Sequence, residues 1–465
     1  MQGHDASCLI LNDVTNNKES KGLTCFLQAL FIWRNKIPVL LKIIIIFAGI
    51  LVLNRFGLHL AISLLAGSLS LGFWMGMTPV ELLTCLYKSA INYQTLSLSL
   101  IVWLIMVMSG IMEKSGHMKR LVSSFTRLAR DPRMVGTVMS ALIGLLPMPG
   151  GALFSAPLVD ESLSRANATP EHKTALNYWY RHIWEYWWPL YPGVILAIAL
   201  LNIETWRYMI FAIPMTLLSI GAGYIFIIKP MGSTGSNTGS RITWAGVREF
   251  IYEMLPVILI ILSIILITGL SEVITGIDAD IRIPSLVPVI VGLAAAIIWV
   301  CRTNRIAPSG LLKATFGKSN LAMILLIVSI MLFKGAMTDS GAVQAIRDEL
   351  MTYGIPAILL IIIMPFFSGV ILGIAVGFVG ASFPLIIPLF PSHDTFTYLS
   401  YAALAYTFGY MGMMLSPVHL CFIVTRDFFK ARIGGSYSYI IKTSVTVLAS
   451  ATILFIIVNF LHGFF

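Results

Sequence analysis

The sequence predicts an all-α polytopic membrane protein with about ten transmembrane helices. Of its 465 residues, 57% are apolar and only 11% are Asp, Glu, Lys or Arg, whereas a soluble domain carries about 25% charged residues. The apolar runs are continuous, as over residues 42–53, and lack the period-2 alternation of an outer-membrane barrel. Because so little polar surface is available, most of the molecule must face lipid.

Ten apolar stretches are interpreted as membrane crossings. They cover residues 38–54, 58–74, 96–112, 175–201, 208–228, 255–270, 284–300, 321–337, 398–425 and 439–461. The first 21 residues are polar apart from one short apolar run, which excludes a cleavable signal peptide and favours a disordered tail.

Two further apolar segments are split in the middle by glycine and proline. They are GLLPMPGGALFSAPL from Gly144 and FFSGVILGIAVGFVGASFPLIIPL from Phe366. Each arm has about 12 to 15 residues, short of the roughly 20 that a crossing needs, so each segment is expected to form a re-entrant hairpin. Non-helical backbone persists at membrane depth only against protein or a wet cavity, so the tips should point at a cavity.

The same order of features recurs in the two halves of the chain. The pattern G-x-M-x-x-S-G occurs at Gly110 and again at Gly335, and Pro189 and Pro417 are separated by nearly the same interval. We therefore expect a polar tail over 1–21, a first transmembrane repeat over 22–230, a Gly/Ser linker over 231–240 and a second repeat over 241–465.

Each half has five crossings and one hairpin, so the second half must be inverted relative to the first, as in secondary transporters. Lysine and arginine support this topology if the loop after the third span is cytoplasmic, because the outer loops between spans then hold only Lys88, Arg207, Arg282 and Arg347. The exception is the amino-terminal arm, residues 18–36. The net charge of +10 therefore reflects orientation in the membrane and not binding to nucleic acid.

The motif GLLPMPGGALFSAPLVD and the Trp- and Pro-broken helix NYWYRHIWEYWWPLYPG resemble an uncharacterised family of prokaryotic integral membrane proteins in the ion-transporter superfamily. That superfamily includes anion and dicarboxylate symporters, gluconate and lactate permeases, arsenite exporters and sodium/proton antiporters. The resemblance covers the chain after about residue 22. It implies two inverted repeats, each with a hairpin and a broken helix that form a site at the membrane midplane. It implies no particular substrate, because the superfamily carries both anions and cations.

Candidate binding residues at the hairpin tips and the second broken helix are Pro147, Pro149, Gly150, Gly151, Gly377, Gly380, Ser382, Ser416 and His419. Proline removes backbone donors and glycine permits positive φ, which frees carbonyls for Na⁺ and helix N-terminal amides for an anion. The alternatives are a structural kink at the first tip, a GxxxG-like packing face at the second, and a packing role for the lone histidine.

The fourth span carries Asn177, Arg181 and Glu185 on one helical face, with His182 beside them. Ionisable groups at this depth cost about 2.5 to 3.5 kcal/mol each, so they should face a cavity or pair with one another. A self-satisfied Arg181–Glu185 ion pair that merely holds the helix is the alternative. Breaks with unpaired carbonyls are expected at Pro189/Pro192 and at Pro417.

Nothing in the sequence indicates an enzyme or a bound cofactor. The five cysteines form no C-x-x-C pair and are interpreted as packing residues, not as disulfides or metal ligands. The Gly317-Lys318-Ser319 segment lacks the P-loop glycine, since residue 312 is leucine, and no H-E-x-x-H motif occurs.

The leading prediction is an ion-coupled secondary transporter of a small anionic substrate, a carboxylate or oxyanion, that works by alternating access as a multi-pass protein of the cell (cytoplasmic) membrane. Arg181 and half-helix N-termini would bind the anion, with Na⁺ on hairpin carbonyls or H⁺ on Glu185 as the coupling ion. A cation/proton antiporter is one alternative and a non-transporting accessory or signalling protein the other. The expected partners are the lipid bilayer and the substrate, and a homodimer remains open.

Overall fold

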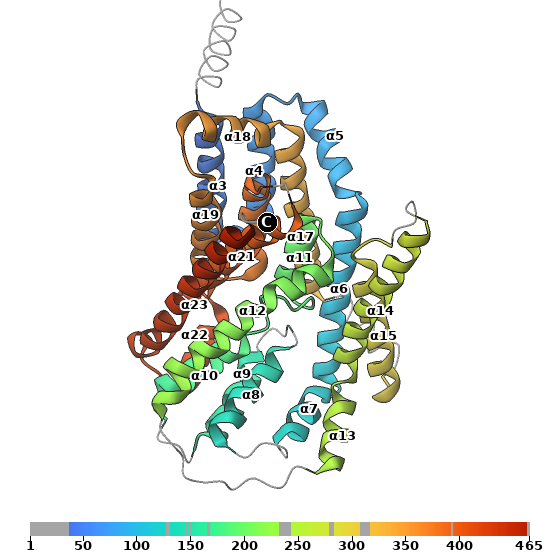
Figure 1. Cartoon of the computed structure of the whole chain (residues 1–465), viewed down its shortest axis with the longest axis vertical. Helices are drawn as coiled ribbons and strands as arrows, with labels where there is room; N and C mark the ends of the chain where they lie inside the picture. The colour runs from blue at the N-terminus through green and yellow to red at the C-terminus, as the bar shows by residue number, and fades with distance from the viewer. Residues whose placement is uncertain are drawn as a thin grey trace, which may run out of the picture.

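The computed structural model describes residues 37–126, 131–145, 147, 151–164, 168–231, 243–278, 283–306, 317–391 and 394–462 (Figure 1). These ranges contain helices and no strand, in agreement with the all-α prediction. The expected tail over 1–21, residues 232–240 of the linker, and two candidate residues, Pro149 and Gly150, lie outside the described residues.

The described helices of the first half are α3 (Val39–Arg55), α4 (Leu60–Met75), α5 (Pro79–Ala90), α6 (Tyr93–Lys114), α7 (His117–Thr126), α8 (Pro132–Gly144), α9 (Gly151–Ser162), α10 (Pro170–Arg181), α11 (Pro192–Leu201) and α12 (Thr205–Gly223). A π turn and a 3₁₀ turn continue α12 to Met231. The sequence interpretation placed no element at α5. This helix begins with a capping box, in which Thr78 and Glu81 bond to each other's backbone amides, and with Pro79 as its first residue.

The described helices of the second half are α13 (Trp244–Glu253), α14 (Leu255–Ile277), α15 (Val287–Thr303), α17 (Lys318–Asp339), α18 (Ala342–Tyr353), α19 (Ala357–Leu372), α20 (Ala375–Ile386), α21 (Thr395–Met414), α22 (Leu420–Phe429) and α23 (Ile433–His462). From α17 to α23 the described helices follow one another in the same order as from α6 to α12. The starts of α17, α18 and α19 follow those of α6, α7 and α8 at one constant interval, and the starts of α22 and α23 follow those of α11 and α12 at a slightly longer one.

Among the described residues, five helices are long and apolar enough to cross a membrane. They are α6, α12 with its extension to Met231, α14, α17 and α23 up to Phe460. α4, α11, α15, α19 and α20 are apolar but shorter, with 10 to 17 residues each. The expected spans 175–201 and 398–425 are interrupted at proline, and three others are helices of 16 or 17 residues, so five of about ten expected crossings are present as full-length helices.

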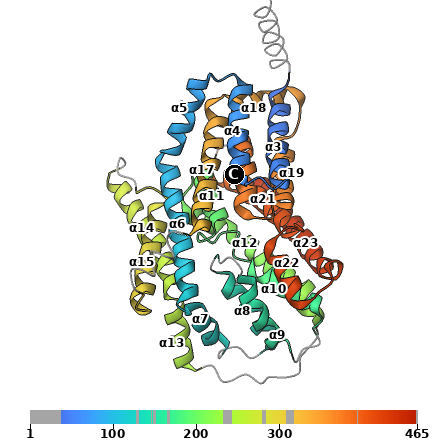
Figure 2. The ribbon, with the colours of Figure 1, turned by 180° about the vertical axis from the view of Figure 1, so that it is seen from behind.

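Two helix pairs cover the segments in which hairpins are expected. α8 packs on α9, and α19 packs on α20. α20 follows α19 after a turn at Gly373, whose φ of +64° lies in the left-handed region that suits glycine. Figures 1 and 2 show α8 and α9 toward the end of the molecule that holds α7 and α13, and α19 toward the opposite end beside α18.

Two further helix pairs, α3–α4 and α14–α15, are joined to the long helices. α4 packs on α17 and α15 packs on α6, while α6 and α17 contact each other. Both views show α14 and α15 along the outer side of α6 (Figure 2). The side chains of Leu262, Ile265, Leu266 and Val273 in α14 are exposed, as expected for a helix that faces lipid.

The interrupted helices lie at the centre of the molecule. Every residue of α11 is buried, as is every residue of α10 from Thr174 to Arg181. α21 buries most of its length as well. The polar side chains expected at the site are thus placed among protein atoms and not at a lipid-facing surface.

Candidate functional site

Both expected helix breaks are present. α10 ends at Arg181, the chain then runs in turns, and α11 begins at Pro192. α21 ends at Met414, and α22 begins at Leu420. Pro189 and Pro417 lie inside the two interruptions, where their missing N–H groups cost no helical hydrogen bond.

Three backbone carbonyls at the breaks accept tyrosine hydrogen bonds, which the sequence prediction of unpaired carbonyls did not include. The Tyr406 hydroxyl donates to the Glu185 carbonyl at 2.8 Å, and the Tyr410 hydroxyl donates to the His182 carbonyl. In the other direction, the Tyr178 hydroxyl donates to the Met414 carbonyl at 3.0 Å. The tyrosines of each broken helix thus supply the hydrogen bonds that the opposite helix loses, because buried carbonyls without a partner are costly.

The turns after α10 also cap the end of α8. The indole N–H groups of Trp184 and Trp188 donate to the carbonyls of Ala141 and Leu145, each at 2.8 Å. The Tyr191 hydroxyl donates to the Gly144 carbonyl. These aromatic residues satisfy the last carbonyls of α8, which have no partner within the helix.

Arg181 is buried where two helices begin. The residue is only 5% exposed, and Nη1 donates to Sγ of Cys421, the second residue of α22, at 2.9 Å. The guanidinium also lies against Gly151, the first residue of α9, where a Cβ atom would be 2.5 Å from Nη2. A cation and the positive ends of two helix dipoles therefore meet at one point in the interior.

His182 and Glu185 lie beside this point. Nε2 of His182 is 3.7 Å from Oε1 of Glu185, and Nδ1 of His182 is 2.6 Å from the Tyr178 carbonyl. Both residues are buried. The Glu185 carboxylate lies beside His182 and forms an ion pair with it only when the imidazole is protonated, whereas Arg181 donates to a sulfur. The i, i+4 ion pair between Arg181 and Glu185, considered above as the alternative, is therefore not the arrangement seen.

Asn177 lies in the same helix but in a fully satisfied environment. Its Oδ1 accepts from Ser140 Oγ at 3.1 Å, and its Nδ2 donates to Thr425 Oγ1 at 3.2 Å. These bonds connect α8, α10 and α22, so the amide holds the broken helix against its neighbours.

The candidate residues at the hairpin turns have packing and hydrogen-bond partners. The Pro147 carbonyl accepts from Ser109 Oγ at 2.9 Å. A Cβ atom on Gly380 would overlap the side chain of Ile330, and Ser382 bonds the carbonyl of Phe378 in its own helix. A Cβ atom on Gly377 would overlap the side chain of Ile374 and crowd that of Leu372. Ser416 Oγ donates to the Val370 carbonyl at 2.7 Å.

The structure therefore brings together Gly151, Arg181, His182, Glu185 and His419, and places Gly377, Gly380 and Ser382 in helix packing. Cys421 and three tyrosines, Tyr178, Tyr406 and Tyr410, are site residues that sequence reasoning missed. Cys421 forms a His-x-Cys pattern with His419, shortly after Pro417, and this local spacing was the available signal. The tyrosine bonds join one half of the chain to the other and leave no local signal.

A cavity lies next to the second break. It has a volume of about 310 Å³ and is lined by Leu51, Val52, Arg55, Val370, Ile371, Pro417 and Val418. The gap beside His182 and Tyr410 has no room for a water molecule. The centre is thus closed in this conformation, while an apolar space with one arginine approaches it from the α3–α19 side.

These features define an integral membrane protein with two interrupted helices crossing at a polar centre. Its fold resembles the crystal structure of the Alcanivorax borkumensis YdaH transporter, described as having an unusual topology, with a TM-score of 0.55 and 16% identity over 80% of this chain and 87% of that one. The chain belongs to the DUF401 family, described as proteins of unknown function, whose model matches residues 39–458. A comparison with curated proteins finds no match.

Proposed function

We propose that the protein is an ion-coupled secondary transporter, not an enzyme, that moves a small carboxylate or oxyanion across the cytoplasmic membrane by alternating access. The observation that carries this proposal is the position of Arg181. Its buried guanidinium lies against the first residue of α9 and donates to the second residue of α22. An anion placed there gains from the guanidinium and from two helix N-termini at once, in an interior where such interactions are strong.

Two inverted repeats are supported by reciprocal contacts at the centre. Tyr178 and Tyr406 are separated by the same interval as Pro189 and Pro417. Each of these tyrosines donates to a carbonyl in the break of the other half. Exchange of equivalent contacts is what an approximate two-fold axis between the halves produces.

Close backbone approaches give a second, independent support for the repeats. A Cβ atom on Gly144 of α8 would overlap the Arg181 carbonyl oxygen, and one on Gly369 of α19 would overlap the Gly409 carbonyl oxygen. Gly144 and Gly369 are separated by the same number of residues as the two G-x-M-x-x-S-G patterns. Arg181 and Gly409 are separated by the same number of residues as Pro189 and Pro417. In the proposed architecture, α8–α9 and α19–α20 are the two re-entrant hairpins, entering from opposite faces, and each is seated on its own broken helix.

Among the two coupling ions considered, H⁺ carried by the Glu185–His182 pair has the better support. Three carbonyls of the breaks already accept tyrosine hydrogen bonds, which makes them poorer Na⁺ ligands. The buried Glu185 is within 3.7 Å of an imidazole nitrogen that can exchange a proton with it.

The cation/proton antiporter is the weaker candidate. Among the described residues, the buried acids are Glu185 and Glu253, and Glu253 ends α13, ahead of the long helix α14. A cation site would need several buried carboxylates, whereas the described residues place only one at the centre. A non-transporting accessory protein has no need of a charged group buried between two broken helices.

The experiment is a ligand-stabilisation screen of the purified protein against small carboxylates and oxyanions, at two pH values, with and without Na⁺. A ligand at 100 times its dissociation constant stabilises the native state by about 2.7 kcal/mol. We expect a stabilising anion for the wild type and for Arg207→Lys, a control arginine that is 40% exposed and paired with Glu204. Arg181→Lys should keep its unliganded melting temperature and lose the response, because lysine lacks the planar fork.

Uptake of the stabilising anion into liposomes under a proton gradient then tests transport. The proposal fails if no carboxylate or oxyanion stabilises the wild type, or if Arg181→Lys responds as the wild type does.

A further inference from the structure

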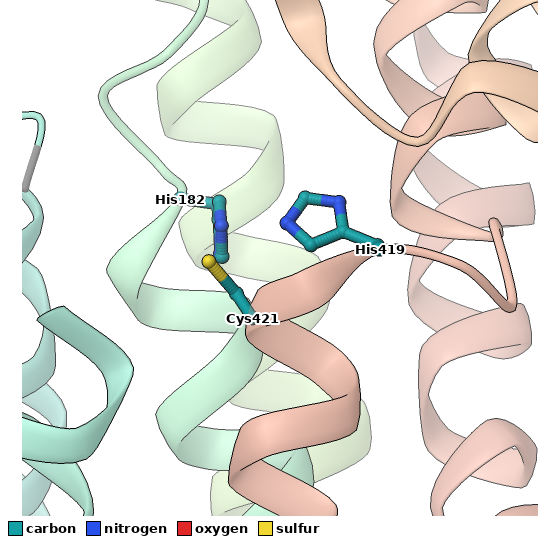
Figure 3. Close-up of side chains that lie close together, drawn as sticks. All are labelled: His182, His419 and Cys421. Atoms are coloured by element: carbon teal, nitrogen blue, oxygen red, sulfur yellow. The ribbon is translucent and has the colours of Figure 1, made fainter. Parts of the chain in front are cut away.

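We infer that His182, His419 and Cys421 bind a thiophilic transition-metal ion of the Zn²⁺ class, in a site that joins the two broken helices. One ligand atom from each residue lies within 4.8 Å of the other two. Figure 3 shows the three side chains pointing toward one another. Ligand atoms of a tetrahedral zinc site are about 3.3 to 3.8 Å apart, so the cluster needs to contract by about 1 Å at its widest.

The hydrogen bonding of His182 leaves a nitrogen lone pair for the ion. Nδ1 lies 2.6 Å from the Tyr178 carbonyl, and because a carbonyl only accepts, Nδ1 carries the proton. Nε2 is then the nitrogen with the lone pair. A ring that donates from one nitrogen to a carbonyl and offers the other to the ion is the usual arrangement of metal-bound histidine.

The ring of His419 is held in place by aromatic neighbours. Its centroid is 5.0 Å from that of His182 and 5.2 Å from that of Tyr178, both in edge-to-face contact. The residue is 5% exposed. Nδ1 of this buried imidazole has no hydrogen-bond partner among the described residues, although buried polar atoms normally have one. Binding a metal ion would give the ring a function.

The chemistry of the three groups selects the class of ion. Two imidazoles and a sulfur suit Zn²⁺, Co²⁺ or Cu⁺, whereas Mg²⁺ and Ca²⁺ take oxygen ligands. The Glu185 carboxylate, 3.7 Å from Nε2 of His182, is close enough to take a fourth position after a small shift. With a thiolate and a carboxylate, a divalent ion is charge-balanced, and its binding releases the thiol proton to solvent.

Arg181 contacts one ligand of the metal site and does not block the binding of an ion. Its Nη1 donates to Sγ of Cys421, the kind of outer contact that sulfur ligands accept. The positive charge repels a second cation, so we expect weaker binding than in structural zinc sites. The inference does not depend on transport, because binding is measured on the purified chain without substrate.

The test is a titration of the full-length, tag-free, metal-stripped protein with Co²⁺, whose thiolate complex absorbs in the near ultraviolet. We expect one Co²⁺ per chain with a charge-transfer band, displaced by Zn²⁺, in the wild type and in Cys301→Ser, a control cysteine in α15. Cys421→Ser should lose the band, and His419→Gln should weaken binding at least tenfold. A band of equal strength in Cys421→Ser, or no band in the wild type, overturns the inference.

Alkylation of the wild-type protein provides a measurement that needs no variant. Zn²⁺ should slow the maleimide labelling of Cys421, quantified by peptide mass, and leave the labelling of Cys301 unchanged. Equal labelling of Cys421 with and without Zn²⁺ would overturn the inference even if the serine variant failed to fold.

Discussion

Tyr406→Phe removes a single oxygen atom from the centre of the molecule. The lost hydroxyl donates to the Glu185 carbonyl at 2.8 Å, in a bond that is buried on both sides. The carbonyl then keeps its burial and loses a partner, which costs about 1 to 3 kcal/mol. Tyr178→Phe removes the reciprocal bond to the Met414 carbonyl at 3.0 Å, so its cost should fall in the same range.

The assay is the free energy of unfolding in mixed micelles, measured by tryptophan fluorescence as the denaturing detergent increases. Tyr353→Phe is the control, because that side chain is 58% exposed in α18 and its change should stay within about 0.5 kcal/mol. If the two breaks stabilise each other, the loss of unfolding free energy in the double variant should differ from the sum of the losses in the two single variants. Losses near those of the control for both tyrosines would refute the view that they replace the missing helical bonds.

Three further predictions concern the centre and the periphery. Gly151→Ala places a methyl group 2.5 Å from Nη2 of Arg181. It should move the guanidinium by about 1 Å and weaken anion binding by as much as 100-fold. The control variant Gly221→Ala, which has open space around the new methyl group, should bind the anion as the wild type does. Glu185→Gln should abolish uptake driven by a proton gradient in liposomes and retain exchange of substrate, and loss of both would assign the carboxylate to binding. Burial lowers the pKa of His117 at the start of α7, although the nearby Glu253 acts to raise it. The free energy of unfolding should therefore be constant above about pH 6.5 and fall as the pH decreases below it. His117→Gln should remove this pH dependence.

The breaks and the broad class could be predicted because their causes are local. Proline at 192 and 417 cannot continue a helix, and the apolar composition leaves lipid as the main solvent. The pairing of three of the freed carbonyls could not be predicted, for a physical reason. Whether a freed carbonyl finds a donor depends on Tyr406 and Tyr410, which lie in the other half of the chain.

Cys421 was interpreted as a packing residue because a single cysteine in an apolar stretch usually is one. Its contact with Arg181 joins two halves of the chain, and no spacing within either half encodes it. The position of Glu185 shows the same limit. The i, i+4 rule holds on a continuous helix, whereas α10 ends at Arg181 and turns the carboxylate toward His182.

The contact between α19 and α21 determines which parts of the molecule can slide. Gly369 of α19 lies on the backbone of Gly409, and Gly412 of α21 lies on the backbone of Phe366, so a methyl group at either glycine would overlap a carbonyl oxygen. Two helices in backbone contact resist axial rotation and register shifts, since either movement drives a side chain into the gap. Spin labels on α19 and α21 should therefore keep a constant separation through the working cycle, and the bending should be found at the Tyr353–Pro356 turn or near Leu389.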